Sequence, residues 1–374
     1  MDSFEDLYTC TPAEFRDAME RLTADPQYGL LAPLLFPELS PDELRRQLFA
    51  MTGVREFQEK VMVRACRYII DHTMTSFTYS GWEYIADGRP ALFISNHRDI
   101  VLDAMLLQYI QLCQGHDSSY LVVGSNLFAT PMMALLARVN KMFGIGRGGT
   151  PREYYDVLMT MSHYLRYVVV GRGSYAWIAQ RNGRTKDGLD RTDPALIKMI
   201  AASGGDGVDP VDSLTAMNIV PVSVSYEWEP CGPQKAREVC LTRQGPYVKQ
   251  PGEDTQSIVS GITDFKGRVH IAICPPVQPS ELQSLQGDFK AVAQLLDRRI
   301  ADGFRLWPNH YIAADILAGR PASRAYTPAE REAFERYLDR ACADSGLGDP
   351  FRQDLLGIYS NALITNHYSL ITIH

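Results

Sequence analysis

A histidine and an aspartate follow directly after an apolar segment that is typical of a buried strand. Residues 91–95 are Ala-Leu-Phe-Ile-Ser, and they lead into Asn96, His97 and, after five intervening residues, Asp103. A histidine is the side chain best suited to accept a proton near neutral pH. An aspartate bonded to its other ring nitrogen fixes the tautomer and stabilises the imidazolium that forms. His97 and Asp103 therefore predict a general base with its orienting carboxylate.

The spacing of His97 and Asp103 limits where a helix can begin. At about 100° per residue, two side chains at this spacing lie on different sides of an ideal helix. They can meet only if His97 precedes the helix, which would then begin near Asp99. Asp99 would serve as the N-cap residue, or it would itself be the partner of His97. Asp103 is the favoured partner, and Asp99 remains the alternative.

Three cations lie close together after a second apolar segment of strand type. Arg181, Arg184 and Lys186 fall within six residues, with Gly183 and Thr185 between them. The planar fork of arginine and the point charge of lysine are donors that suit a phosphate or a carboxylate. The cluster predicts an anion-binding loop, and a solvated basic loop is the alternative.

The two segments resemble the signature of the glycerolipid acyltransferases, which move a fatty acyl group from a thioester carrier to a hydroxyl. Members usually carry Asn-His, four further residues and Asp, so the separation of His97 and Asp103 is longer by one residue. The Gly-Arg-Thr segment at 183–185 matches the family's Gly-Arg-Ser/Thr loop, which holds the phosphate of the acceptor. Asn182 stands where the family often has an acidic residue, so the role of that carboxylate does not carry over.

Two further segments follow the family's order. Residues 141–149 resemble its short block of an apolar core followed by an arginine, here Arg147. Residues 218–227 resemble its final strand with an internal proline, here Pro221, and a proline predicts an edge or irregular strand position. The resemblance covers roughly residues 78–276.

By this resemblance, the chain is expected to transfer an acyl group from acyl-coenzyme A or an acyl-carrier protein. The acceptor would be the hydroxyl of an anionic, glycerol-phosphate-type molecule in phospholipid biosynthesis. His97 would remove the hydroxyl proton, Asp103 would orient His97, and no metal or other cofactor is implied. The substrate would be bound by residues of the later segments: Arg147, Arg181, Gly183, Arg184, Thr185 and Lys186.

Two alternatives remain open. The acceptor could be an amino-acid lipid, which would make the chain an O-acyltransferase of another acceptor class. The chain could also be a catalytically silent protein of the same fold that binds a lipid or an acyl carrier, because the His97 to Asp103 spacing and Asn182 depart from the family pattern. Release of free thiol from an acyl thioester only when an acceptor alcohol is added would separate the enzyme from the silent protein.

The composition is that of a globular enzyme. The chain has 374 residues, of which 45% are hydrophobic and 22% charged, and its formal net charge of −7 argues against a nucleic-acid partner. Its seven cysteines contain no Cys-x-x-Cys pair, which indicates reduced thiols. The acidic residues 1–6 do not resemble a signal peptide. A cytoplasmic location is expected, with a peripheral position at the inner face of the membrane as an option.

Residues 118–137 form an uncharged stretch whose length matches that of a membrane-spanning helix. A spanning helix needs about twenty predominantly apolar residues, and the polar breaks at 124–126 and 130–131 argue against one. The apolar pairs 127–128 and 132–133 either contact a membrane surface or lie in the protein core.

The periodicities predict an α/β protein with a mostly parallel mixed sheet flanked by helices, and with helical extensions at both ends. Thr11 and Ser40 each precede a Pro-x-Glu sequence, which predicts helix starts with a capping box. The expected division is a helical N-terminal region at 1–77, an acyltransferase core at 78–276 and a helical C-terminal region at 277–374. A strand is expected at 78–84, and further strands are expected near Ala91, Tyr120, Tyr175, Ile219, Glu238 and Arg268.

Overall fold

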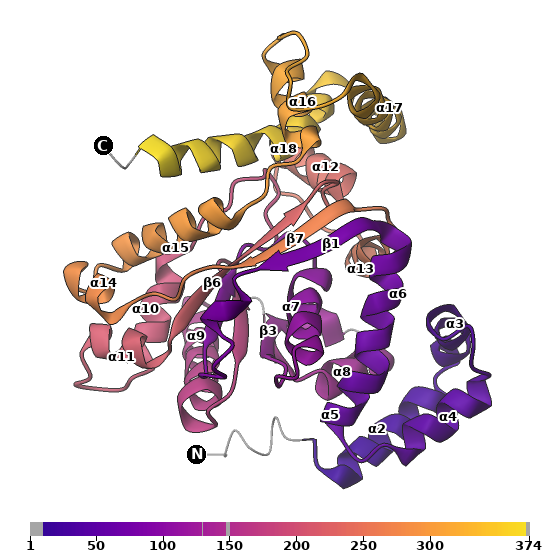
Figure 1. Ribbon diagram of the computed structural model, residues 1–374, viewed down its shortest axis with the longest axis vertical. Helices are drawn as coiled ribbons and strands as arrows, with labels where there is room; N and C mark the ends of the chain where they lie inside the picture. The colour runs from indigo at the N-terminus through magenta and orange to yellow at the C-terminus, as the bar shows by residue number, and fades with distance from the viewer. Residues whose placement is uncertain (1–9, 129, 147–149, 372–374) are drawn as a thin grey trace.

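The computed structural model describes residues 10–128, 130–146 and 150–371 and is built around a seven-stranded sheet (Figure 1). The strand order is β1-β7-β6-β2-β5-β3-β4, and all neighbouring strands are parallel except β6 and β7. The predicted mostly parallel mixed sheet is confirmed. The strands are β1 (Met74–Ser80), β2 (Leu92–Ser95), β3 (Tyr120–Gly124), β4 (Met142–Ile145), β5 (Ala176–Ala179), β6 (Ile219–Tyr226) and β7 (Gly267–Ile273).

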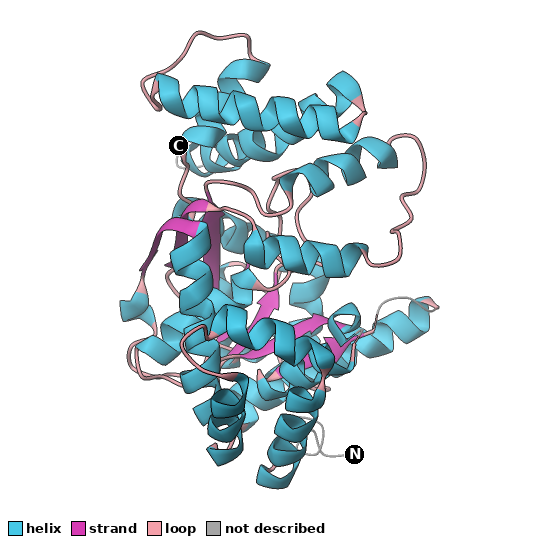
Figure 2. Cartoon of the chain, turned by 90° about the vertical axis from the view of Figure 1, so that its right-hand side faces the viewer, coloured by secondary structure: helices cyan, strands magenta, loops and turns pink. Residues whose placement is uncertain are grey.

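Helices cover both faces of the sheet, which gives a three-layer α/β sandwich (Figure 2). Side chains alternate along β2, so that Phe93 faces one layer of helices while Leu92 and Ile94 face the other. The layer on the Phe93 side contains α6 (Val63–Thr73), α7 (Leu102–Cys113) and α13 (Glu253–Thr263). The opposite layer contains α9 (Pro151–Arg166), α10 (Pro194–Ala202), α11 (Pro210–Ala216), α14 (Pro279–Ser284) and α15 (Phe289–Gly303).

The N-terminal helices form a separate apolar cluster that covers α8 (Pro131–Val139). Thr11 and Ser40 close capping boxes with Glu14 and Glu43, which confirms both predicted helix starts. Met132 of α8 is buried in this cluster. The helices are α2 (Pro12–Ala24), α3 (Pro26–Leu35), α4 (Pro41–Ala50) and α5 (Val54–Phe57).

The C-terminal helices form a second cluster at the other end of the molecule, together with α12 (Figure 1). Ala236 and Cys240 of α12 pack there against Phe334 and Tyr359. Because α12 follows soon after β6, it joins the C-terminal helices to the sheet. The helices are α12 (Gly232–Thr242), α16 (Pro308–Leu317), α17 (Pro328–Ser345) and α18 (Gly348–Ile371).

Five predicted strands, near Ala91, Tyr120, Tyr175, Ile219 and Arg268, are confirmed, and two predictions need correction. The first strand begins at Met74 and ends at Ser80, earlier than the predicted 78–84. The strand predicted near Glu238 is wrong, because Glu238 lies in α12. Ala236 and Cys240 are four residues apart and face the same cluster, which is the period of a helix.

Pro221 does not mark an edge strand, since β6 lies between β7 and β2. The Pro221 carbonyl accepts a hydrogen bond from the Cys274 amide at 2.9 Å, on the β7 side. The N–H and C=O groups of one strand residue point to the same neighbouring strand. The position where Pro221 lacks an N–H therefore faces β7. The antiparallel pairing of β6 with β7 begins only at the next residue, Val222. The pairing of β6 with β2 therefore loses no hydrogen bond.

The short strand β4 was not predicted from the sequence, because four residues show no clear period.

No helix in the described part of the chain is long and apolar enough to cross a membrane. Within residues 118–137, Leu127 and Met132 are 8% and 3% exposed. Phe128 and Met133 pack against the core on the Phe93 side of the sheet. The core alternative therefore holds for these side chains.

The burial of Met132 can be tested by introducing a charge. Met132→Asp should lower the free energy of unfolding by about 3 kcal/mol or more, because an unpaired carboxylate would be buried among apolar helices. Leu30 lies in the same cluster of helices but is 77% exposed. Leu30→Asp should therefore change the free energy by less than about 0.5 kcal/mol. Urea denaturation measures both values, and equal losses would contradict the burial of Met132.

Candidate active site

The carboxyl ends of β2 and β5 bring two distant segments of the chain together. Ser95 and Ala179 pair in register at the ends of the two strands. The Gln180 amide donates to the Ser95 carbonyl at 2.8 Å, and the Thr185 amide donates to the His97 carbonyl at 2.8 Å. The segment that carries His97 and the cationic segment therefore lie side by side at one edge of the sheet.

His97 contacts Asp103 and not Asp99. Nδ1 of His97 lies 2.9 Å from Oδ2 of Asp103. Because α7 begins at Leu102, His97 precedes the helix and Asp103 lies in its first turn. Oδ1 of Asp99 instead accepts from the amides of Val101 and Leu102, both at 2.8 Å, as a capping side chain does. Of the two carboxylates that the sequence left open, Asp103 is the one that reaches the imidazole.

The Asp103 carboxylate is buried and held by several donors. The amides of Arg98 and Asp99 donate to the same oxygen as His97, at 2.6 and 2.9 Å. The Tyr226 hydroxyl donates to the other oxygen at 2.9 Å. Because a carboxylate can only accept hydrogen bonds, Nδ1 of His97 carries the proton in this pair. The lone pair is then on Nε2, the nitrogen that a base would use.

Tyr226 was not among the residues predicted from the sequence. It is the last residue of β6, and burial together with the neighbouring Asp103 raises its pKa well above the ordinary value. Tyr226 therefore keeps its proton and acts only as a donor to Asp103. The sequence predicted a strand at residues 218–227, which include Tyr226. It did not predict the contact with Asp103, because that contact requires β6 to lie beside β2 in the sheet.

The Asn96 side chain forms hydrogen bonds that connect the end of β2 to β6 and to Asp190. Its Nδ2 donates to the Val224 carbonyl and to Oδ2 of Asp190, both at 3.0 Å, and the Val224 amide donates back to Oδ1 at 2.8 Å. These bonds fix the backbone immediately before His97. The Asn-His dipeptide was the only sequence signal for this role, because both partners come from distant segments.

The cationic segment folds into a tight loop. Gly183 has φ 76°, a left-handed conformation that glycine adopts without strain. Nη2 of Arg181 donates to the Thr185 hydroxyl at 2.8 Å, and that hydroxyl donates to the Leu189 carbonyl at 3.0 Å. Nη1 of Arg184 is buried and has no hydrogen-bond partner within the described chain. Arg184 is therefore the loop cation that is best prepared to receive an anion.

Lys186 differs from the two arginines because it already has a carboxylate partner. It forms a charged hydrogen bond with Glu238 of α12. Burial, and then the charge of Arg184, lower the pKa of Lys186 to about 8, although Glu238 acts in the opposite direction. Lys186 therefore begins to lose its charge just above neutral pH. Arg147, the remaining predicted cation, lies outside the described residues.

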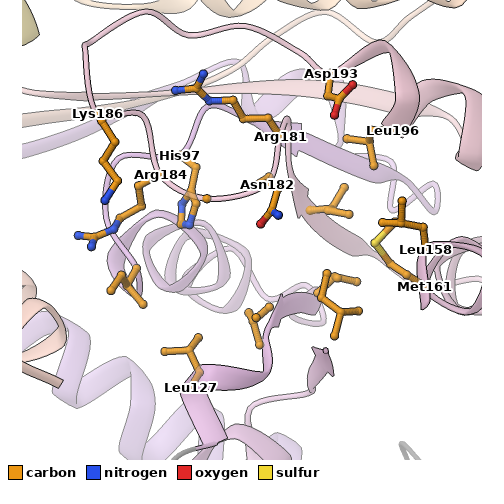
Figure 3. Close-up of a pocket in the computed structure, with 18 of the residues that line it drawn as sticks. His97, Leu127, Leu158, Met161, Arg181, Asn182, Arg184, Lys186, Asp193 and Leu196 are labelled. Atoms are coloured by element: carbon orange, nitrogen blue, oxygen red, sulfur yellow. The ribbon is translucent and has the colours of Figure 1, made fainter. Parts of the chain in front are cut away.

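A cavity of about 680 Å³ opens beside His97 (Figure 3). Figure 3 shows His97, Arg184 and Lys186 on one side of this cavity and the apolar Leu158 and Met161 on the other. The cavity thus has an apolar part between the sheet and helices α9 and α10, and a charged part at the loop. Its other apolar lining residues include Val122, Leu127, Ile145, Val157, Ile178 and Leu196.

The arrangement does not include a cluster of metal-binding side chains. Across the described residues, no three His, Cys, Asp or Glu side chains are grouped so that they could hold a metal ion. All seven cysteines lie in the described ranges and are free thiols.

The fold and the site define an α/β protein with a paired histidine at the carboxyl edge of a mostly parallel sheet, beside a cavity that is partly apolar and partly charged. Residues 76–225 match the family model described as Acyltransferase. Residues 76–225 therefore form an acyltransferase-family domain. The matched residues include the His97–Asp103 pair and the loop with Arg184.

Among solved structures, the chain is similar to the crystal structure of the 1-acyl-sn-glycerophosphate (LPA) acyltransferase PlsC from Thermotoga maritima. The similarity covers 77% of this chain and 97% of that chain, with 15% sequence identity and a TM-score of 0.35. Comparison with curated proteins found no match.

The protonation of Lys186 can be measured without a substrate. In protein labelled with ¹³C at the lysine Cε, the Lys186 signal should titrate near pH 8, and Lys186→Arg assigns it. Glu238→Gln should move the midpoint to lower pH, because the Glu238 carboxylate favours the ammonium form. A midpoint near the ordinary lysine pKa would contradict the effect of burial on Lys186. A midpoint that rises in Glu238→Gln would contradict its pairing with Glu238.

Proposed function

We propose that the protein transfers a fatty acyl group from acyl-coenzyme A or an acyl-carrier protein to the hydroxyl of an anionic, glycerol-phosphate-type acceptor. The observation that carries this proposal is that His97, which is paired with Asp103, lines the same cavity as the apolar side chains of α9 and α10 and the cations of the loop. An acyl thioester has a long apolar chain, and an acceptor of this class has an anionic head. The bond between them would form where the two parts of the cavity meet.

His97 would act as the general base. Its Nε2 accepts the proton of the acceptor hydroxyl while the oxygen attacks the thioester carbonyl carbon, since an alcohol without assistance is a weak nucleophile at neutral pH. The carbon–sulfur bond then breaks, and the imidazolium returns the proton to the thiolate. Asp103 stabilises the imidazolium and holds the ring, as its 2.9 Å contact with Nδ1 allows.

The apolar part of the cavity would hold the acyl chain. Leu158 and Met161 of α9 and Leu196 of α10 lie along it, and the sheet closes it from the opposite side. Burial of hydrocarbon contributes about 0.8 kcal/mol per CH₂ group. A long chain is therefore favoured as a donor substituent over a short one.

The cationic part would bind the head of the acceptor. Arg184 offers a buried guanidinium nitrogen, Nη1, that has no hydrogen-bond partner within the described chain, and Arg181 adds a second guanidinium group in the same loop. Gly183 and Thr185 would shape the loop, and Lys186 would add charge in its ammonium form. An acceptor that carries lipid chains would arrive from a membrane surface, so the proposal includes a peripheral position at the cytoplasmic face of the membrane.

The base assignment is tested by acyl transfer from a long-chain acyl thioester to glycerol 3-phosphate. The wild type should release thiol only when the acceptor is present, and His97→Ala should lower kcat by roughly 10²-fold or more with its fold intact. Asp103→Asn should produce a comparable loss. Asp99→Asn is the matched control, because an amide oxygen can still accept the two capping hydrogen bonds, and it should change kcat much less.

Thiol release that does not depend on an acceptor would contradict acyl transfer and favour a lipid-binding or acyl-carrier-binding protein. Near-normal turnover in His97→Ala would contradict the role of the base.

The acceptor site is tested by the KM values of the two substrates. Arg184→Ala should raise the KM of glycerol 3-phosphate about 10- to 100-fold, because a charge-assisted hydrogen bond contributes roughly 1.5–3 kcal/mol. The KM of the thioester should change little. Lys249 also lines the cavity but is paired with Asp254 at 2.6 Å, so Lys249→Ala is the control and should have a smaller effect.

Equal use of glycerol 3-phosphate and uncharged glycerol by the wild type would contradict an anion site. A preference for a lyso form of an amino-acid lipid would assign the enzyme to that acceptor class.

A further inference from the structure

Arg98, the residue after His97, is buried in a cluster of four charged side chains. Its guanidinium group donates to Asp190 at 2.6 Å and to Glu229 at 3.1 Å. The fourth member is Lys235, whose ammonium donates to Glu229 at 2.5 Å. Exposed fractions are 2% for Arg98 and 1% for Lys235, so the two positive and two negative charges balance away from solvent.

Lys235 also binds the backbone of the loop that carries the base. Its Nζ donates to the Arg98 carbonyl at 2.6 Å. On the other side of the same residue, the Arg98 amide donates to Oδ2 of Asp103 at 2.6 Å. Both peptide groups of Arg98 are therefore fixed, one by Lys235 and the other by the carboxylate that contacts His97. The Arg98 carbonyl shares one planar peptide group with the Asp99 amide, which donates to the same Asp103 oxygen at 2.9 Å. Any movement of this carbonyl would therefore tilt an amide that holds Asp103.

The cluster is anchored by elements beyond the acyltransferase-family match, which ends at residue 225. Lys235 belongs to α12, one turn before Glu238, the partner of Lys186. The Glu229 amide donates to the Tyr359 hydroxyl of α18 at 3.1 Å. Helix α12 packs against the C-terminal helices (Figure 1). It contacts the loop that carries His97 through Lys235 and the cationic loop through Glu238.

We propose that Lys235 is a positioning residue for the His97–Asp103 pair, which it orients through the Arg98 peptide. This proposal rests on the proposed function, because it assigns Lys235 a part in the turnover of that site. Lys235 is not among the residues that line the cavity. Its removal should therefore lower kcat while the KM values of both substrates stay within about threefold, since misplacement of a base by a fraction of an ångström affects the chemical step.

The test uses the double variant Lys235→Met/Glu229→Gln in the full chain. This change removes one positive and one negative charge, so that Arg98 and Asp190 remain a balanced pair and no buried charge is left alone. We expect kcat to fall at least tenfold. The amide proton of Asp99 should also move upfield in the NMR spectrum, because its hydrogen bond to Asp103 lengthens.

Arg243→Met is the matched control. Arg243 is the C-cap residue directly after α12 and also joins this helix to α18, through its ion pair with Asp354, but it does not contact the Arg98 peptide. Its kcat should stay within twofold of the wild type. Lys235→Arg is the second variant, because it keeps the charge of the cluster while its longer side chain displaces the donor from the Arg98 carbonyl. It should also lower kcat without a change in KM.

An unchanged kcat in either folded Lys235 variant would overturn the positioning role. So would an equal loss in Arg243→Met, or KM increases that match the loss of kcat, because these results would indicate a general structural effect. A wild type without acyl transfer would instead contradict the proposed function, whatever the variants do.

Discussion

The parallel pairing of β2 with β5 and β6 is the constraint on which the candidate site depends. Residues 92–94 of β2 are fully buried, so neither the position nor the register of this strand can shift without exposing its side chains or leaving its backbone groups unpaired. Parallel strands end at the same edge of a sheet. The segments after β2 and β5 must therefore meet there, and the Asn96 side chain joins the third strand, β6, to the same edge.

The extra residue between His97 and Asp103 is accommodated in the turn before α7. Arg98 and Asp99 turn their amides toward Asp103, while the Asp99 side chain caps the start of the helix. The segment between His97 and Asp103 thus supplies two amide donors to the buried carboxylate, which lies 2.9 Å from the imidazole. Because Arg98 is also buried, its charge requires partners, and these come from Asp190 and Glu229. The turn that carries Arg98 is therefore coupled to a cluster of buried charges behind the site.

The cations of the loop have different electrostatic environments. Lys186 is paired with Glu238 and has a pKa lowered to about 8, mainly by burial, whereas Arg184 retains an unpaired donor. A guanidinium group stays charged over the whole physiological range. The permanent part of the positive charge in this loop therefore comes from arginine, and Lys186 adds a part that depends on pH.

Features that depend on local chemistry and on short spacings could be predicted from the residues alone. The period of apolar residues gave five strands and the sheet class, the Ser/Thr-Pro-x-Glu sequences gave two helix starts, and the motifs gave His97 and the loop around Arg184. The helix around Glu238 was wrongly predicted as a strand. Its buried residues, Ala236 and Cys240, are recognised as one helix face only once their packing against the C-terminal helices is known.

Only the tertiary structure decided which distant groups meet. The Tyr226 hydroxyl bond, the pairing of Lys186 with Glu238 and the approach of Lys235 to the Arg98 carbonyl all join different elements. The order of strands, and not the order of residues, sets these distances. A hydrogen bond requires its two atoms to lie within about 3 Å, and a linear sequence does not contain that information for residues far apart in the chain.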